Sequence, residues 1–440
     1  MNYLTKPRKT NSMPKGIPYI IGNELAERFS FYGMKCILII FMTQYLINDN
    51  NALDPMSDTE ATKWYHLFTS AVYFTPIFGA LLSDIFIGKF KTILLLSIIY
   101  CFGHLSLAID ETRFGLIIGL SLISIGAGGI KPCVSAHVGD QFGKTNSILL
   151  TKVFSWFYLS INMGAFISTL LTPYLLHNYG PWLAFGIPGL LMFIATYIFW
   201  LGRHVFIHIP PKGLAFFKKI VSKESMYSIS KLSIIYIFIA IFWSLFDQTG
   251  STWVLQAENL NRNWLGINWY SSQIQSINPI MILIFAPLFS YYLYPKLNKI
   301  TNLTDLKKIS MGLFLAVPSF IIIGFLEKWI ELGYTPSIGW QVFAYIILTA
   351  SEVLVSITCL EFSYTQAPNF MKSLIMGFFL LSVSIGNIFT VWINSFMIAN
   401  NITYSQSYFN FYAFLMLVTA LLFLLVVKFY RPNYYIHNEA

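Results

Sequence analysis

Charged residues are scarce in this sequence. Only 11% of its 440 residues are Asp, Glu, Lys or Arg, whereas ordinary soluble proteins contain about 25%. Apolar residues make up 56% of the chain and aromatic residues 18%. This composition excludes an ordinary soluble domain and indicates a membrane protein.

Cysteine is also rare, and its spacing is not that of a metal site. The four cysteines lie apart, within or beside apolar segments, which predicts structural thiols. No His/Glu metal spacing and no Ser/His/Asp arrangement stands out, so we expect no enzyme active site and no metal. The basic N-terminus precedes an apolar run that is too long and too charged for a signal peptide, so we expect it to stay attached.

Long apolar segments dominate the chain. A segment of about 20 residues can span a bilayer, and the sequence contains twelve such segments, at 17–47, 61–83, 91–109, 114–137, 151–176, 182–202, 231–257, 272–295, 308–327, 338–362, 371–398 and 406–430. The sequence therefore predicts an all-α integral membrane protein with twelve transmembrane helices.

The 28 Lys and Arg residues are distributed unevenly between the ends of these segments. With the N-terminus in the cytosol, the inner connections hold 21 of them, the outer connections hold four, and three lie inside the membrane. Cytoplasmic loops of membrane proteins carry such a basic excess. The bias predicts that both termini are cytosolic, and it explains the net charge of +9 without a nucleic-acid partner.

The longest inner connection divides the segments six plus six. It is basic and runs over 203–230, so we expect one six-helix bundle over 1–202 and another over 231–440, with a short surface helix over 215–222. This plan resembles the major facilitator superfamily. The segment GALLSDIFIGKFKT, with Asp84 and Lys89, resembles the superfamily's loop between helices 2 and 3, and it predicts a breakable cytosolic contact at Asp84.

The first apolar segment contains an unusual charged stretch, NELAERFSFYGMK. At about 100° per residue, Glu24, Arg28 and Lys35 fall within roughly 40° of one another on a helix, and Glu27 lies about 60° to one side. A charge inside a bilayer costs at least ~2.5 kcal/mol, so such residues indicate a functional site by default.

Other segments contribute ionisable residues to the same set. Asp247 and Glu352 lie near mid-depth, where an unpaired carboxylate tends to take up a proton. The set comprises Glu24, Glu27, Arg28, Lys35, Lys131, Asp247, Glu352 and Glu361, with His66 near the outer end of the second segment.

The charged stretch resembles the E-x-x-E-R-F-x-Y-Y-G motif of proton-dependent oligopeptide transporters, a family of the major facilitator superfamily. Further segments resemble the same family, especially its animal-type di/tripeptide members: GAGGIKPCVSAHVGDQF, FSWFYLSINMGAFIST, FWSLFDQTGSTWVLQA and EVLVSITCLEFSYTQAPNFMKS. The resemblance implies symport of di- and tripeptides into the cell with protons as the coupling ion and no other cofactor. It also implies a protein that functions as a monomer in the cell membrane, the cytoplasmic membrane if the source is prokaryotic.

The resemblance also assigns roles to individual residues. Glu352 matches the glutamate that holds the peptide amine, while Lys35 and Lys131 match basic positions that face the peptide carboxylate. The residues implied in proton coupling are Glu24, Glu27, Arg28, His66, Lys131, Asp247 and Glu352. Further implied binding residues are Tyr32, Tyr73, Asn162, Trp243 and Asn278, and the implied gating residues are Asp84 and Trp253.

The chemistry of the set agrees with these roles. A zwitterionic substrate needs an acid for its amine, a base for its carboxylate and aromatic walls for its side chains. We expect Glu24 or Glu27 to pair with Arg28 or Lys131, and Lys131 to pair with Glu352 on the cytosolic side.

Two positions depart from the family pattern. Lys35 stands where arginine is common, which replaces a bidentate fork by a point charge. Phe31 replaces the first tyrosine of the Tyr-Tyr-Gly motif, which removes one hydroxyl.

Two other functions stay open at this point. One is a family relative that carries another small solute, such as nitrate, histidine or another amino acid. The other is a transporter-like receptor, although a receptor would tolerate loss of the intramembrane charges. The amine-binding position at Glu352 favours peptides over a bare anion.

Overall fold

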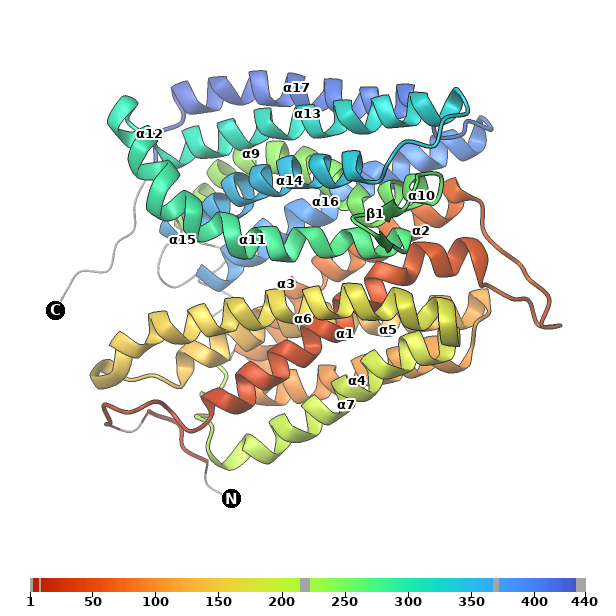
Figure 1. Cartoon of the computed structure of the whole chain (residues 1–440). Helices are drawn as coiled ribbons and strands as arrows, with labels where there is room; N and C mark the ends of the chain where they lie inside the picture. Colours follow the sequence, from red (N-terminus) through yellow and green to blue (C-terminus); the bar gives the residue numbers. More distant parts are fainter. Residues whose placement is uncertain (1–2, 8, 214–221, 367–371, 433–440) are drawn as a thin grey trace. The chain divides into compact units, whose positions relative to one another are not determined.

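A computed structural model describes residues 3–7, 9–213, 222–366 and 372–432, and this part of the chain is almost entirely helical (Figure 1). Eleven of its helical segments are long and apolar enough to cross a membrane. Helix α1, Ile17–Gln44, has a similar length but carries Glu24, Glu27, Arg28 and Lys35. With α1 the segments number twelve, as predicted. The predicted surface helix over 215–222 lies outside the described residues, except for Ser222.

The chain forms two compact units. Unit 1 comprises Met1–Pro55 and Ala71–Ser225, and unit 2 comprises Met56–Ser70 and Met226–Ala440. The division therefore runs through α2, Asp58–Phe74. The bundle boundaries predicted at the 203–230 connection stay predictions.

Unit 1 contains α1 and the segments up to the long connection. Helix α1 packs against α6 and α7, and α4 packs against α5 and α7. The rings of Phe41 and Phe185, 5.0 Å apart, form part of the interface between α1 and α7. The further elements are α3 Pro76–Leu81, η1 Leu82–Ile87, α4 Lys89–Ile109, α5 Arg113–Asp140, η2 Lys144–Leu149, α6 Leu150–Tyr179, α7 Pro181–Leu201 and η3 Gly202–His204.

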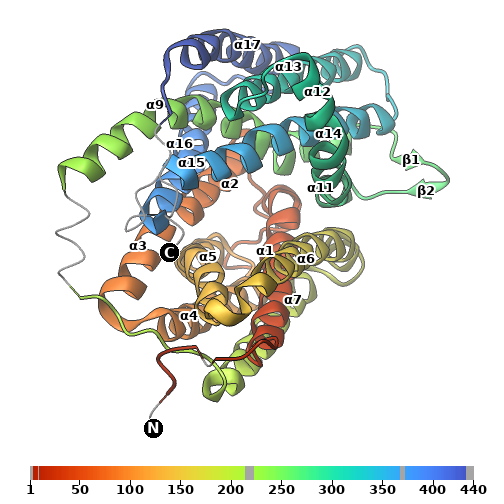
Figure 2. The ribbon, with the colours of Figure 1, turned by 90° about the vertical axis from the view of Figure 1, so that its left-hand side faces the viewer.

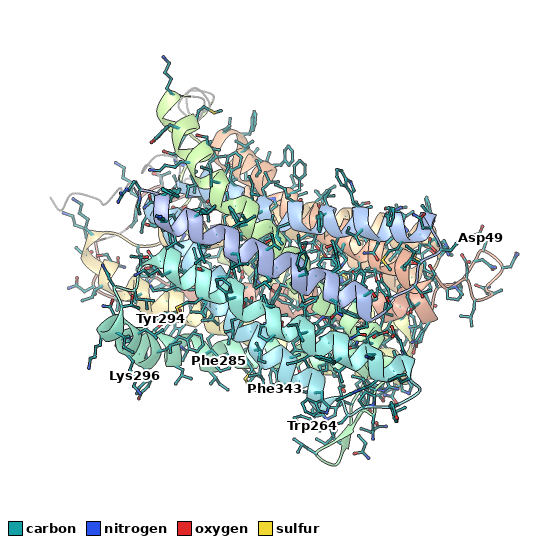
Figure 3. All side chains as sticks on the ribbon, turned by 90° about the horizontal axis from the view of Figure 1, so that it is seen from above. Asp49, Trp264, Phe285, Tyr294, Lys296 and Phe343 are labelled. Carbon is teal, nitrogen blue, oxygen red and sulfur yellow. The ribbon has the colours of Figure 1, made fainter. Side chains whose placement is uncertain are left out.

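Unit 2 is built around α13, which packs against α14 and α17; Figure 2 shows α13 beside α17. Within unit 2, Tyr294 and Lys296 mark the end formed by α12, and Trp264 marks the end that carries a short β-hairpin (Figure 3). Its elements are α9 Lys223–Phe246, η4 Asp247–Gly250, α10 Thr252–Glu258, β1 Asn263–Trp264, β2 Ile267–Asn268, η5 Ser271–Ser276, α11 Ile277–Leu288, η6 Phe289–Leu293, α12 Tyr294–Ile300, α13 Asp305–Glu331, α14 Gly339–Glu352, η7 Val353–Ile357, α15 Thr358–Gln366, α16 Lys372–Ala399 and α17 Gln406–Phe429.

Several membrane helices change their winding at ionisable residues. Asp247 begins the 3₁₀ turn η4, Glu352 precedes the π-helical turn η7, and Asp84 lies in the π-helical turn η1. Turns of this kind inside α-helices occur often at functional sites. The local structure thus marks three of the positions that the sequence singled out.

Glycine allows α3 and α5 to approach each other closely. A Cβ atom added to Gly79 would lie 2.2 Å from the carbonyl oxygen of Gly129. Because this oxygen belongs to the backbone, a change of side-chain rotamer cannot relieve the clash. The crossing of α3 and α5 therefore requires glycine at position 79.

We expect Gly79→Ala to lower the thermal unfolding midpoint of the detergent-purified protein, since overpacking costs about 1–3 kcal/mol. Gly22→Ala is the matched control, because Gly22 lies in a helix with no neighbouring atom within 4 Å of the added Cβ. The control should unfold at or above the wild-type midpoint, because Ala favours helix over Gly by about 1 kcal/mol. Equal midpoints for the two variants would contradict the close approach.

Candidate functional site

The charged face of α1 forms a buried three-residue cluster. Arg28 Nε donates a 2.7 Å hydrogen bond to Glu24 Oε1 and lies 3.2 Å from Glu27 Oε2. The exposed fractions of Glu24 and Glu27 are 1% and 0%. The predicted pairing with Arg28 is thus present, and one guanidinium serves two carboxylates.

Lys131 lies on an aromatic platform in the same unit. Its Nζ atom is 4.1 Å from the ring centre of Phe31 on α1 and 4.3 Å from that of Tyr73 on α2. The negative face of each ring attracts the ammonium group. Phe31 therefore keeps the ring face that a tyrosine would offer, although it lacks the hydroxyl.

Three further predicted residues of unit 1 lie on two helices, α1 and α6. Tyr32 and Lys35 follow the charged cluster on α1, where Tyr32 packs edge-on against Phe31 and Lys35 is buried. Asn162 is buried in α6 and donates to the carbonyl of Tyr158 within its own helix.

The GALLSDIFIGKFKT segment provides an ion pair between helices. Lys89, the first residue of α4, donates a 2.7 Å hydrogen bond to Asp140 at the end of α5. The backbone carbonyl of Asp84 accepts from the amide of Lys212. Sequence reasoning did not single out Asp140, because its partner lies on another helix.

In unit 2, Glu352 is held by an amide. Asn278 Nδ2 on α11 donates a 2.6 Å hydrogen bond to Glu352 Oε2 and also contacts Thr349 Oγ1 at 3.2 Å. Both Asn278 and Glu352 are half-buried. A neutral amide fixes the carboxylate without neutralising it, so the carboxylate can still bind a cation or a proton.

His66 belongs to a chain of hydrogen bonds inside unit 2. Its Nδ1 lies 2.6 Å from Asn387 Oδ1, and its Nε2 lies 3.0 Å from Ser251 Oγ. Asn387 Nδ2 donates at 2.8 Å to Asp247 Oδ2. Because the amide nitrogen faces Asp247, the amide oxygen accepts from Nδ1, which therefore carries a proton. Nε2 is then the basic nitrogen of the neutral ring, and it accepts from Ser251.

Sequence reasoning missed Asn387 and Ser251. Both side chains are fully buried. A neutral polar residue in a hydrophobic segment is a weaker indication of a functional site than a charged one. The spacing of Asn387, Thr390 and Asn394, which places them on one face of α16, was a usable signal.

The two predicted tryptophans have different surroundings. Trp253 is fully buried and packs edge-on against Tyr345, with ring centres 4.9 Å apart. Trp243 is half-buried beside Phe242 and Phe246. Among the described residues, no group of three or more His, Cys, Asp or Glu side chains could hold a metal ion.

Comparisons with known proteins agree with these features. The family model PTR2, described as the POT family, matches residues 90–232 and 215–410. Solute carrier family 15 member 2 of Homo sapiens is 36% identical over 408 residues, which cover 80% of this chain and 55% of that protein. Peptide transporter family 1 of Drosophila melanogaster is 37% identical over 365 residues, which cover 72% of this chain and 48% of that protein. The chain thus spans about half the length of these relatives.

Two solved structures match over nearly the whole chain. The POT family transporter PepTSo has a TM-score of 0.85 at 33% identity, with 95% of this chain and 98% of that chain covered. An auto-inhibited POT family peptide transporter has a TM-score of 0.86 at 32% identity, with 97% and 99% covered. These matches confirm the predicted all-α fold of the major facilitator superfamily, while the orientation of the termini stays a prediction. The chain is a multi-pass membrane protein and belongs to the POT family.

Proposed function

We propose that the protein is a symporter that moves di- and tripeptides into the cell together with protons. The observation that carries this proposal is the presence of half-buried charges of both signs, Lys131 in unit 1 and Glu352 in unit 2. A peptide has one ammonium and one carboxylate group, and each forms charge-assisted hydrogen bonds with a partner of opposite sign. Relatives named as peptide transporters support the substrate class.

The peptide carboxylate would bind to Lys131. The rings of Phe31 and Tyr73 lie against the ammonium group, and a charge-assisted hydrogen bond from this group would hold the peptide carboxylate. Lys35 adds a second positive charge from α1. Because lysine is a point charge, this arrangement tolerates more than one carboxylate geometry.

The peptide amine would bind to Glu352. Asn278 occupies one carboxylate oxygen, which leaves the other lone pairs for an ammonium group. A bare anion such as nitrate has no use for such a position. A free amino acid would satisfy both charges, so only the length of the substrate distinguishes it from a peptide.

The cluster on α1 would couple the proton to the peptide. Two carboxylates share the single positive charge of Arg28, and Glu27 also lies within electrostatic reach of Lys131. A nearby cation favours an ionised carboxylate. When a peptide carboxylate neutralises Lys131, that support weakens and Glu27 takes up a proton more readily. Peptide binding and protonation then favour each other reciprocally.

His66 would receive a proton in unit 2. A proton on Nε2 makes both ring nitrogens donors, so the Ser251 hydroxyl must turn away from the ring. The carbonyl of Gln248, 3.5 Å from Ser251 Oγ, can accept it. The imidazolium formed would be stabilised through Asn387 by the carboxylate of Asp247.

Transport itself would follow the alternating-access scheme of the superfamily. In that scheme the two six-helix halves of a carrier rock about its substrate site, so that the site opens to one side of the membrane at a time.

The proposed coupling predicts that peptide uptake into proteoliposomes is faster at an external pH of about 5.5 than at about 7.5, because His66 and the carboxylates then bind protons more often. A protonophore should abolish uphill accumulation but leave equilibration intact. The same assay with a free amino acid and with nitrate tests whether the protein carries one of these solutes instead of peptides. Uptake that changes neither with pH nor with the protonophore would exclude proton symport.

The proposed amine site predicts that Glu352→Gln weakens the binding of dipeptides by about 1.5–3 kcal/mol, or roughly 10- to 150-fold in Kd, since a charge-assisted hydrogen bond is lost. Binding is measured by thermal shift against increasing peptide concentration. Glu258→Gln is the matched control, because Glu258 pairs with Arg262 at 3.0 Å in a partly exposed position. N-acetylated dipeptides should bind equally to the wild type and Glu352→Gln. An equal loss for both kinds of peptide would refute the amine site.

A further inference from the structure

A seam of polar residues connects one end of unit 2 with His66. On α2, Asp58, Thr62 and His66 are four residues apart and share one helix face. Tyr408 and Tyr412 have the same spacing in the first turns of α17, and Tyr404 lies two residues before that helix begins. Asn387, Thr390 and Asn394 lie on one face of α16. We call these nine residues the hydroxyl seam.

The tyrosines of the seam contact one another and their neighbours at the end of unit 2 that is predicted to face the cell exterior. The hydroxyl of Tyr404 donates to Asn394 Oδ1, and Tyr404 also lies beside Thr62. The ring centres of Tyr404 and Tyr408 are 4.8 Å apart, and those of Tyr408 and Tyr412 are 5.1 Å apart. The three tyrosines therefore form a continuous row.

The row continues towards His66. The hydroxyl of Tyr412 lies beside those of Tyr408 and Thr390. Thr390 is less than one helical turn from Asn387, whose amide contacts both His66 and Asp247. The titratable groups around the seam are thus Asp58, His66, Asp247 and the tyrosines, with Glu327 near Asp58 and Glu352 near Asp247.

Packing does not explain these hydroxyls. Thr62, Thr390 and Tyr412 have exposed fractions of 0%. Within the described residues, the hydroxyls of Thr62, Tyr408 and Tyr412 make no hydrogen bond of ordinary geometry. A phenylalanine would fill the same space without burying a hydroxyl, and buried polar groups that lack partners require an explanation.

The seam ends at a solvent-accessible group. Asp58 is exposed, and Tyr404 is half-buried beneath it with its pKa raised well above the usual value by burial. Tyr404 therefore keeps its proton over the physiological range and can both donate and accept.

We propose that the hydroxyl seam conducts protons between the Asp58 end of unit 2 and the pair His66 and Asp247. In each step a hydroxyl or water oxygen accepts one proton and releases its own to the next oxygen. The amides of Asn394 and Asn387 hold the row in place and transfer no proton. Solvent water therefore carries the proton from Thr390 to the carboxylate of Asp247, which becomes neutral. The proposal rests on the proposed function and on the predicted orientation. It gives Asp247, which is linked to His66 through Asn387, a proton supply that does not pass through the peptide site.

The test uses Tyr412→Phe and Tyr408→Phe in the purified, reconstituted protein. Each variant keeps the ring and removes one relay oxygen. We expect proton-driven dipeptide uptake to slow on the order of tenfold, by analogy with the loss of a proton-transfer group, and its solvent deuterium isotope effect to increase. Peptide counterflow, which needs no net proton movement, should match the wild type. Tyr236→Phe is the control, because it removes another buried hydroxyl of unit 2 that makes no hydrogen bond within the described residues; it should change nothing.

Wild-type uptake rates and isotope effects in both variants would overturn the relay and leave the proposed function intact. Counterflow that falls together with proton-driven uptake would also overturn it, because that result indicates a packing role. Dipeptide uptake by the wild-type protein that does not depend on the proton gradient would refute the proposed function itself.

Discussion

The shared guanidinium of Arg28 is the interaction on which the account of this protein depends. Glu24 and Glu27 are buried in an apolar bundle, where an uncompensated charge is costly. Arg28 donates its 2.7 Å hydrogen bond to Glu24 and makes only a longer contact, 3.2 Å, with Glu27. The charge of Glu27 therefore depends also on its other neighbours, and Lys131 is one of them.

The two units treat their buried charges differently. In unit 1 the carboxylates of Glu24 and Glu27 lie near the cations Arg28 and Lys131. When a proton neutralises one of these carboxylates, the positive charge of the cations is less compensated and can attract an anion. Unit 2 holds Glu352 and Asp247 by the neutral amides of Asn278 and Asn387. Amides fix a carboxylate in place but leave its charge available for an ammonium group or a proton. This contrast fits a substrate with charges of both signs.

The sequence predicted the helices and the charged residues, because hydropathy and charge act locally. Arg28 lies four residues after Glu24, and their contact was one of the pairings expected among Glu24, Glu27, Arg28 and Lys131. Partners on distant helices were not predictable: Lys89 pairs with Asp140, and His66 bonds to Asn387, 321 residues away. Such contacts depend on how helices pack, and a neutral asparagine in an apolar segment carries little signal of its own. The predicted pairing of Lys131 with Glu352 joins the two units and stays a prediction.

The coupling role of Glu27 is tested most directly by proton entry driven by peptide. Wild-type protein in liposomes that contain a pH-sensitive dye should acidify the lumen when a dipeptide is added outside. Glu27→Gln keeps the size of the side chain and removes its titration, so it should retain peptide counterflow without acidification. Acidification at the wild-type rate in Glu27→Gln would contradict the account.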